Sequence, residues 1–82
     1  MASEAVNNYI TKRYERWLDY SLYHCGLAGI SDEATDVLNE VICSLLQKQS
    51  KLLDKLLDTK KNGYTELDFF VLKMIKLNAS SP

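Results

Sequence analysis

The sequence predicts an all-α fold: a compact bundle of three main helices and one short helix, forming a single domain over residues 1–82. Three observations favour it. The chain of 82 residues can bury one modest core, and 46% of its residues are hydrophobic. Its three glycines and one proline are too few for the turns of a many-stranded sandwich or barrel. Apolar residues instead recur with the 3.6-residue period of a helix.

The first helix is expected over residues 5–25. Its apolar and aromatic side chains recur three or four positions apart and define one helical face: Ile10, Tyr14, Trp17, Leu18, Leu22 and Cys25. Gly26 is expected to end this helix as a left-handed cap.

The second helix is expected over residues 32–47, with Ser31 as its N-cap and two acidic residues in its first turn. It carries the clearest amphipathic stripe of the sequence: Ala34, Val37, Leu38, Val41, Ile42, Leu45 and Leu46. This stripe predicts a helix that packs one full face against the core.

Leucine pairs four positions apart predict a short third helix over residues 50–58. Asn62 and Gly63 then indicate a turn. A hairpin at this turn is not expected, because neither flank alternates as a strand would.

The last helix is expected over residues 66–78, followed by a polar tail at 79–82. Thr65 and Asp68 have the spacing of a capping box, and Tyr64 and Phe69 that of a hydrophobic staple. The helix is apolar on nearly every side, so we expect it to be the central packing element. The core is predicted to contain Trp17, Leu38, Val41, Leu45, Phe70 and Met74.

Enzymatic activity, a metal site and a cofactor are not expected. The chain has one histidine, two cysteines and no glycine-rich phosphate loop. His24 and Cys25 are adjacent on a helix and point apart, and with Cys43 they still lack a fourth zinc ligand. Both cysteines lie in apolar helical patterns as free thiols. No signal peptide or membrane span is visible, which favours a cytoplasmic protein.

Charge is unevenly distributed along the chain. Residues 31–47 contain four acidic residues and no lysine or arginine. Asp36, Asn39, Glu40 and Cys43 fall at i, i+3, i+4 and i+7, so they form one polar stripe beside the apolar face. An ordinary solvated face has the same pattern, but a stripe of one sign also suits a partner of the opposite sign.

Residues 48–82 contain seven lysines against four carboxylates. Lysines next to amides and an aromatic ring are suited to phosphates and unstacked bases, although scattered lysines are also usual on soluble proteins. The candidate residues are Lys60, Lys61, Asn62, Tyr64, Lys73, Lys76 and Asn78.

Three motifs follow one another along the chain. A Tyr-x-x-Leu-Leu-like run stands at Tyr14, Trp17, Leu18 and Leu22. An Asp-x-x-Gln-Glu-like core, with Asn in place of Gln, stands at Asp36, Asn39, Glu40 and Val41, followed by Leu45 and Leu46. An aromatic start and a terminal Lys-x-Asn stand at Phe69, Phe70, Lys76 and Asn78. Over roughly residues 9–78 this pattern resembles the second conserved region of bacterial RNA polymerase sigma factors, especially the extracytoplasmic-function type.

The resemblance implies a transcription-initiation module. It implies that the second helix docks on the clamp helices of the largest subunit of the RNA polymerase core through Asp36, Asn39, Glu40 and Cys43. It also implies that the lysine-rich candidates above contact the single-stranded promoter minus-ten element. The fourth region of such factors, a helix-turn-helix, is absent from the 82 residues, as expected of a truncated chain or of a solitary module carried by a mobile element.

An alternative function is that of a small helical adaptor or homodimer without polymerase or DNA contact. Its interface would be formed by Phe69, Leu72 and Ile75 of the last helix. The sequence leaves the oligomeric state open.

Overall fold

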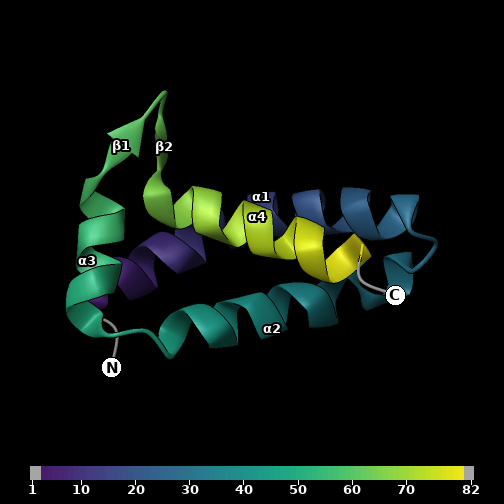
Figure 1. Cartoon of the computed structure of the whole chain (residues 1–82), viewed down its shortest axis with the longest axis horizontal. Coiled ribbons are helices and arrows are strands. Elements are labelled where there is room, and N and C mark those ends of the chain that lie inside the picture. The colour runs from purple at the N-terminus through teal and green to yellow at the C-terminus, as the bar shows by residue number, and fades with distance from the viewer. Residues whose placement is uncertain (1–2, 81–82) are drawn as a thin grey trace.

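The structure is a computed structural model and describes residues 3–80. Four α-helices, one short 3₁₀ turn and one two-stranded hairpin make up the described chain, which confirms the all-α bundle. In chain order the elements are α1 Glu4–Leu27, η1 Ser31–Glu33, α2 Ala34–Leu46, α3 Ser50–Asp58, β1 Lys60–Lys61, β2 Tyr64–Thr65 and α4 Glu66–Ser80. Figure 1 shows α2 and α4 along the long axis, α1 behind α4, and α3 with the hairpin at one end.

The end of α1 differs from the prediction. Gly26 does not cap the helix, which continues to Leu27; the left-handed residue is Gly29, with φ +77°. The Gly29 N–H donates to the Gly26 carbonyl (3.1 Å) and the Ile30 N–H to the Cys25 carbonyl (2.8 Å). These two bonds are those of a Schellman motif, so the helix ends one turn later than the first glycine suggests.

The start of α2 also differs. Ser31 makes no side-chain capping bond; it opens the 3₁₀ turn η1, and the α-helix begins at Ala34 and ends at Leu46. The buried Ser21 hydroxyl of α1 donates to the Ala34 carbonyl at 2.8 Å. The start of α2 is therefore held by α1 rather than by a side chain of its own.

The expected turn at Asn62 and Gly63 is a hairpin, so the rejection of a hairpin was wrong. Lys61 pairs with Tyr64 across this two-residue loop, and Lys60 pairs with Thr65. Asn62 (φ +55°) and Gly63 (φ +83°) both have positive φ, as a type I′ turn requires. Each strand has two residues, too few to show an alternating pattern.

The core joins one face of each of the four helices. Among the predicted core residues, Trp17, Leu38, Val41 and Leu45 are buried, whereas Phe70 and Met74 are only half-buried. The buried row of α4 runs instead along every fourth position: Leu67, Val71, Ile75 and Ala79. The expectation that α4 is covered on nearly every side is wrong, because its outer face is open to solvent.

Two further predictions concern the burial of side chains on α1 and α2. Leu22 of the predicted α1 face is 43% exposed. Cys25 is buried as a small hydrophobe, but Cys43 is exposed.

The bounds of the last two helices also bear on the predictions. The predicted short helix matches α3, Ser50–Asp58, at both ends. The last helix, α4, extends to Ser80, so two residues of the predicted tail are helical and the other two lie outside the described residues.

Candidate functional site

The predicted partner-binding stripe forms one wall of an open groove. All four residues of the stripe are exposed on α2 and face a groove of about 860 Å³ that α4 closes on its other side. The structure therefore brings the four predicted residues together on one surface. We call this surface the acidic groove; it is lined by Glu33, Asp36, Val37, Asn39, Glu40, Cys43, Ser44, Met74 and Asn78.

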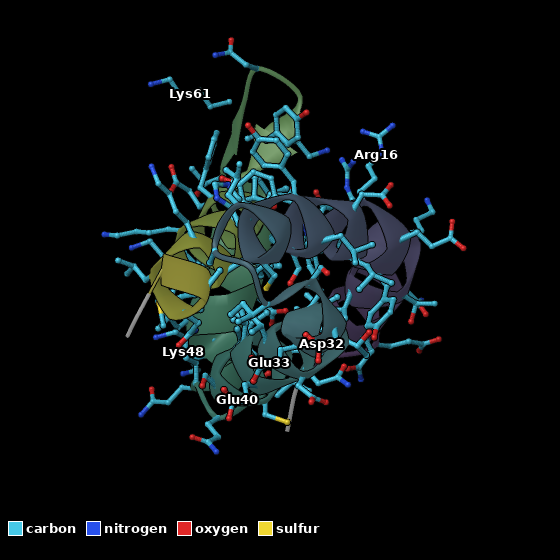
Figure 2. All side chains as sticks on the ribbon, turned by 90° about the vertical axis from the view of Figure 1, so that its right-hand side faces the viewer. Arg16, Asp32, Glu33, Glu40, Lys48 and Lys61 are labelled. Carbon is cyan, nitrogen blue, oxygen red and sulfur yellow. The ribbon has the colours of Figure 1, made fainter. Side chains whose placement is uncertain are left out.

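The charge of the acidic groove is one-signed. Three carboxylates line it, from Glu33, Asp36 and Glu40, and the lining residues include no lysine or arginine. Figure 2 shows Asp32, Glu33 and Glu40 on the same side of the molecule. Lys48 lies near the same side, but its ammonium is 4.7 Å from the centre of the Phe70 ring. The groove is consequently a negative surface that also exposes apolar lining, with Val37 and Met74 among its residues.

Two amides help to shape the acidic groove. The Tyr14 hydroxyl of α1 donates to Asn39 Oδ1 at 3.2 Å, so α1 orients the residue that stands where the sigma-like pattern has Gln. On the opposite wall, Asn78 Nδ2 donates to the Met74 carbonyl at 2.9 Å. Asn78, predicted to bind DNA, therefore lies with the acidic residues and not with the lysines.

The other predicted nucleic-acid residues lie on the hairpin and the outer face of α4. We call Lys60, Lys61, Asn62 and Tyr64 the basic hairpin; all four are exposed. Figure 2 shows Lys61 at the end of the molecule opposite Glu40. The Tyr64 ring is 41% exposed and contacts the Phe69 ring at 6.1 Å between centroids, which confirms the predicted staple.

Lys73 and Lys76 are exposed one turn apart on α4. Lys73 follows the first residue of the helix by seven positions, a rise of about 10 Å. Lys76 lies about 15 Å along α4 from its first residue and lines a separate depression with His24, Leu27, Ala28 and Ala79. Lys73 is therefore the nearer of the two to the basic hairpin, and Lys76 and Asn78 lie toward the other end of α4.

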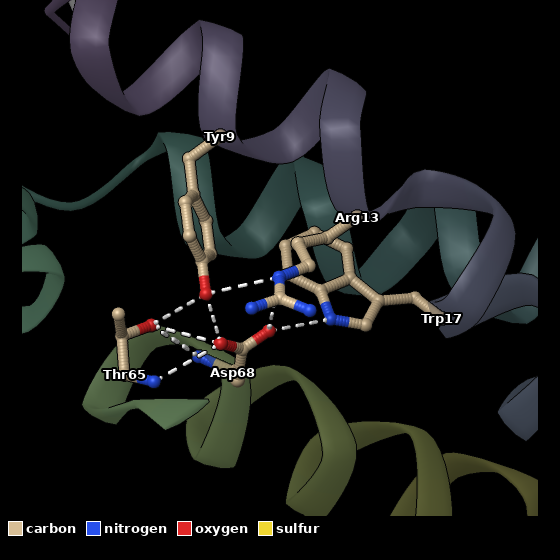
Figure 3. Close-up of polar contacts among 5 residues, drawn as sticks. All are labelled: Tyr9, Arg13, Trp17, Thr65 and Asp68. Carbon is tan, nitrogen blue, oxygen red and sulfur yellow. Dashed lines mark hydrogen bonds and ion pairs between the residues drawn. The ribbon is translucent and has the colours of Figure 1, made fainter. Parts of the chain in front are cut away.

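Sequence reasoning missed a buried polar network at the junction of α1 with β2 and α4 (Figure 3). Asp68 is 1% exposed. Its Oδ1 accepts from Trp17 Nε1 (3.0 Å), and its Oδ2 accepts from the Thr65 N–H and hydroxyl (3.1 Å each) and from the Tyr9 hydroxyl. Arg13 Nε donates to the Tyr9 oxygen at 3.1 Å and lies 3.8 Å from Asp68 Oδ1.

The capping pattern found only half of this network. The Asp68 N–H donates to Thr65 Oγ1 at 3.2 Å, so the reciprocal capping bonds are confirmed. The signal for the other half is the spacing of Tyr9, Arg13 and Trp17, which places three polar donors on successive turns of α1. That spacing shows that the donors share a flank but not which acceptor they meet.

The network holds the carboxylate in its charged form. Burial by itself would raise the pKa of the Asp68 carboxyl, but hydrogen bonds from Tyr9, Thr65 and Trp17 outweigh burial, and that pKa lies below its ordinary value of 3.8. The hydrogen bond to Tyr9 likewise raises the pKa of the Arg13 guanidinium above its ordinary value. The network therefore favours the charged forms of both Asp68 and Arg13.

Within residues 3–80, His, Cys, Asp and Glu side chains do not gather in any group of three or more that could hold a metal ion. His24 packs its ring against Tyr20 (4.4 Å between centroids) and Tyr23 (5.2 Å). In the same described part of the chain, none of the helices combines the length and apolarity needed to cross a membrane.

Comparison with known proteins gave no match to any protein-family model, curated protein or solved structure.

Proposed function

We propose that this chain is a non-enzymatic, sigma-like transcription-initiation module that acts in the cytoplasm and docks on the RNA polymerase core through the acidic groove. One observation carries the proposal: Asp36, Asn39, Glu40 and Cys43, which the resemblance assigns to polymerase binding, line one open groove. The proposal joins that geometry to the sequence resemblance.

The acidic groove suits a basic helical partner. Its carboxylates project from η1 and α2 and remain exposed, so a partner can pair with them without first displacing a cation of the groove lining. The residues of the opposite α2 face, among them Leu38 and Val41, are buried in the core. Charge changes in the groove therefore leave the packing of the helix intact.

Promoter single-strand binding is the second part of the proposal. The basic hairpin supplies cations and an exposed aromatic ring at the end of the molecule opposite Glu40, and Lys73 and Lys76 add exposed cations along α4. The two partners would thus contact separate surfaces and bind together. Asn78 is not included in this surface, because it lines the acidic groove.

The adaptor or homodimer function has less support from the structure. Ile75 is fully buried, so it cannot form part of an interface. Phe69 is 39% exposed and Leu72 is half-buried, so of the three predicted interface residues only Phe69 is exposed. A stable dimer in light scattering, disrupted by Phe69→Ser, would favour that function over the sigma-like one.

The test is a pull-down with purified bacterial RNA polymerase core. Glu40→Lys places a cation in the acidic groove and is expected to lower polymerase recovery at least about tenfold. The matched control is Glu15→Lys, the same change at an exposed position of α1 outside the groove. Undiminished recovery with Glu40→Lys, or equal loss with the control, would contradict the proposal.

A further inference from the structure

One flank of α1 carries three cations between two aromatic rings. Tyr9, Lys12, Arg13, Arg16 and Tyr20 recur three or four positions apart and so share one side of the helix. Tyr64 of β2 adjoins this flank, because the Arg13 guanidinium lies 6.0 Å from the centre of its ring. We call these six residues the α1 band.

Two adjoining depressions follow the α1 band. The first has a volume of about 340 Å³ and is lined by Tyr9, Lys12, Arg13 and Arg16. The second, of about 130 Å³, lies between α1 and α4 and shares Arg13 and Arg16 with the first. Its remaining lining residues are Trp17, Tyr20, Tyr64, Asp68 and Leu72.

The charges of the α1 band are of two kinds. Arg13 already has partners within the protein: it pairs with Asp68, and its guanidinium carbon lies 5.2 Å from the centre of the Tyr9 ring. Lys12 and Arg16 are exposed and form no ion pair with any described residue. Asp68 is the one carboxylate lining either depression, and its oxygens are occupied by the network. Two cations therefore remain available to an anion.

We propose that the α1 band binds single-stranded nucleic acid, with Lys12 and Arg16 contacting phosphates and Tyr64 stacking on a base. Exposed cations beside aromatic rings are the features that single-strand binding surfaces share, because phosphates need charge and unpaired bases need flat partners to stack on. An acidic peptide would use the cations but would leave the rings without a role.

This inference rests on the proposed function and extends it. The basic hairpin and the α1 band share Tyr64, so a strand held at the hairpin can continue along α1. Figure 2 shows Arg16 and Lys61 both away from the side that carries Asp32, Glu33 and Glu40. The α1 band therefore extends the proposed nucleic-acid surface to α1, a helix for which the sequence predicted no binding residues.

The test measures binding of a fluorescent single-stranded DNA of about 12 nucleotides by anisotropy over a range of salt concentrations. The variant Lys12→Gln/Arg16→Gln is expected to weaken binding about tenfold and to lower the slope of log affinity against log salt by about 1.4. Tyr64→Leu, which keeps an apolar contact with Phe69, is expected to weaken binding about fivefold with little change in slope. The matched control is Lys51→Gln/Lys55→Gln on α3, which removes the same charge elsewhere.

Unchanged affinity of the α1 variant, or an equal loss in the α3 control, would overturn the inference. Polyglutamate that binds as tightly and depends on the same residues would also overturn it, in favour of an acidic polypeptide. These results are independent of polymerase docking, because the DNA assay uses the chain alone. Failure of the proposed docking would appear separately, as undiminished polymerase recovery with Glu40→Lys.

Discussion

Trp17 Nε1 donates a hydrogen bond of 3.0 Å to Asp68 Oδ1, across 51 positions of sequence. Both side chains are buried, at 2% and 1% exposure. The bond ties the middle of α1 to the first turn of α4, and the Thr65 and Tyr9 bonds to the same carboxylate attach β2 and an earlier turn of α1. One carboxylate thus fixes the junction from which both the basic hairpin and the α1 band project.

Removing that carboxylate should destabilise the fold strongly. Asp68→Ala leaves the Trp17 and Thr65 donors buried without an acceptor and the Arg13 cation without its counter-charge, at a cost of about 3–5 kcal/mol in the free energy of unfolding. Urea denaturation followed by circular dichroism measures it. Asp19→Ala, at an exposed position of α1, should change the same quantity by less than about 0.5 kcal/mol. Similar values for the two variants would show that the network is not needed.

The network also predicts a pH dependence of stability. The folded-state pKa of Asp68 is lowered, so its contribution is present above the unfolded value near 3.8 and is lost as the pH falls through the folded value. The free energy of unfolding should decrease between about pH 5 and pH 2, and Asp68→Asn should remove part of that decrease. Parallel urea titrations at several pH values measure both proteins. Identical decreases would show that other carboxylates cause the acid sensitivity.

Two glycines should respond oppositely to alanine. Gly63 has φ +83°, so Gly63→Ala should cost about 1–2 kcal/mol through backbone strain, although its Cβ would meet open space. Gly26 lies inside α1, also with open space around it, so Gly26→Ala should add about 0.5–1 kcal/mol of stability. Thermal melts compare the two variants. A destabilised Gly26→Ala protein would contradict the extended end of α1.

Neighbouring leucines of α3 test the burial pattern. Leu53 is fully buried and Leu52 is 43% exposed. Leu53→Ala should cost about 2–5 kcal/mol because it leaves a cavity under the short helix, whereas Leu52→Ala should cost well under half as much. Denaturant titration of both variants provides the comparison. Equal costs would mean that α3 packs on the core in a different orientation.

The sequence predicted the existence of the helices because apolar residues recur at helical spacing along the chain. The α2 stripe predicted Leu38, Val41 and Leu45 in the core, and all three are buried. For α4 the apolar residues surround the helix, so periodicity could not tell the buried row, which contains Ile75, from the half-buried Phe70. Only contacts with neighbouring helices decide that.

The candidate site was predictable where it lay on one helix and unpredictable where it joined several. The wall of the acidic groove on α2 follows from sequence positions, but its lining by Met74 and Asn78 depends on how α4 packs beside α2, which no sequence spacing specifies. The α1 band depends on the contact between Tyr64 and Arg13, which the hairpin brings about. That contact could not be predicted from the sequence, because strands of two residues show no alternating pattern from which the hairpin could be recognised.

The most direct measurement of polymerase docking uses Cys43 as an attachment point. Cys43 is exposed in the acidic groove and Cys25 is buried, so a thiol-reactive photo-cross-linker should label Cys43 alone in the folded protein. We expect illumination with RNA polymerase core to give an adduct with the largest subunit at its clamp helices. The same label at Glu15→Cys, in a Cys43→Ser background, should give none. Polymerase that binds without this adduct, or an equal adduct from the Glu15→Cys position, would contradict docking through the acidic groove.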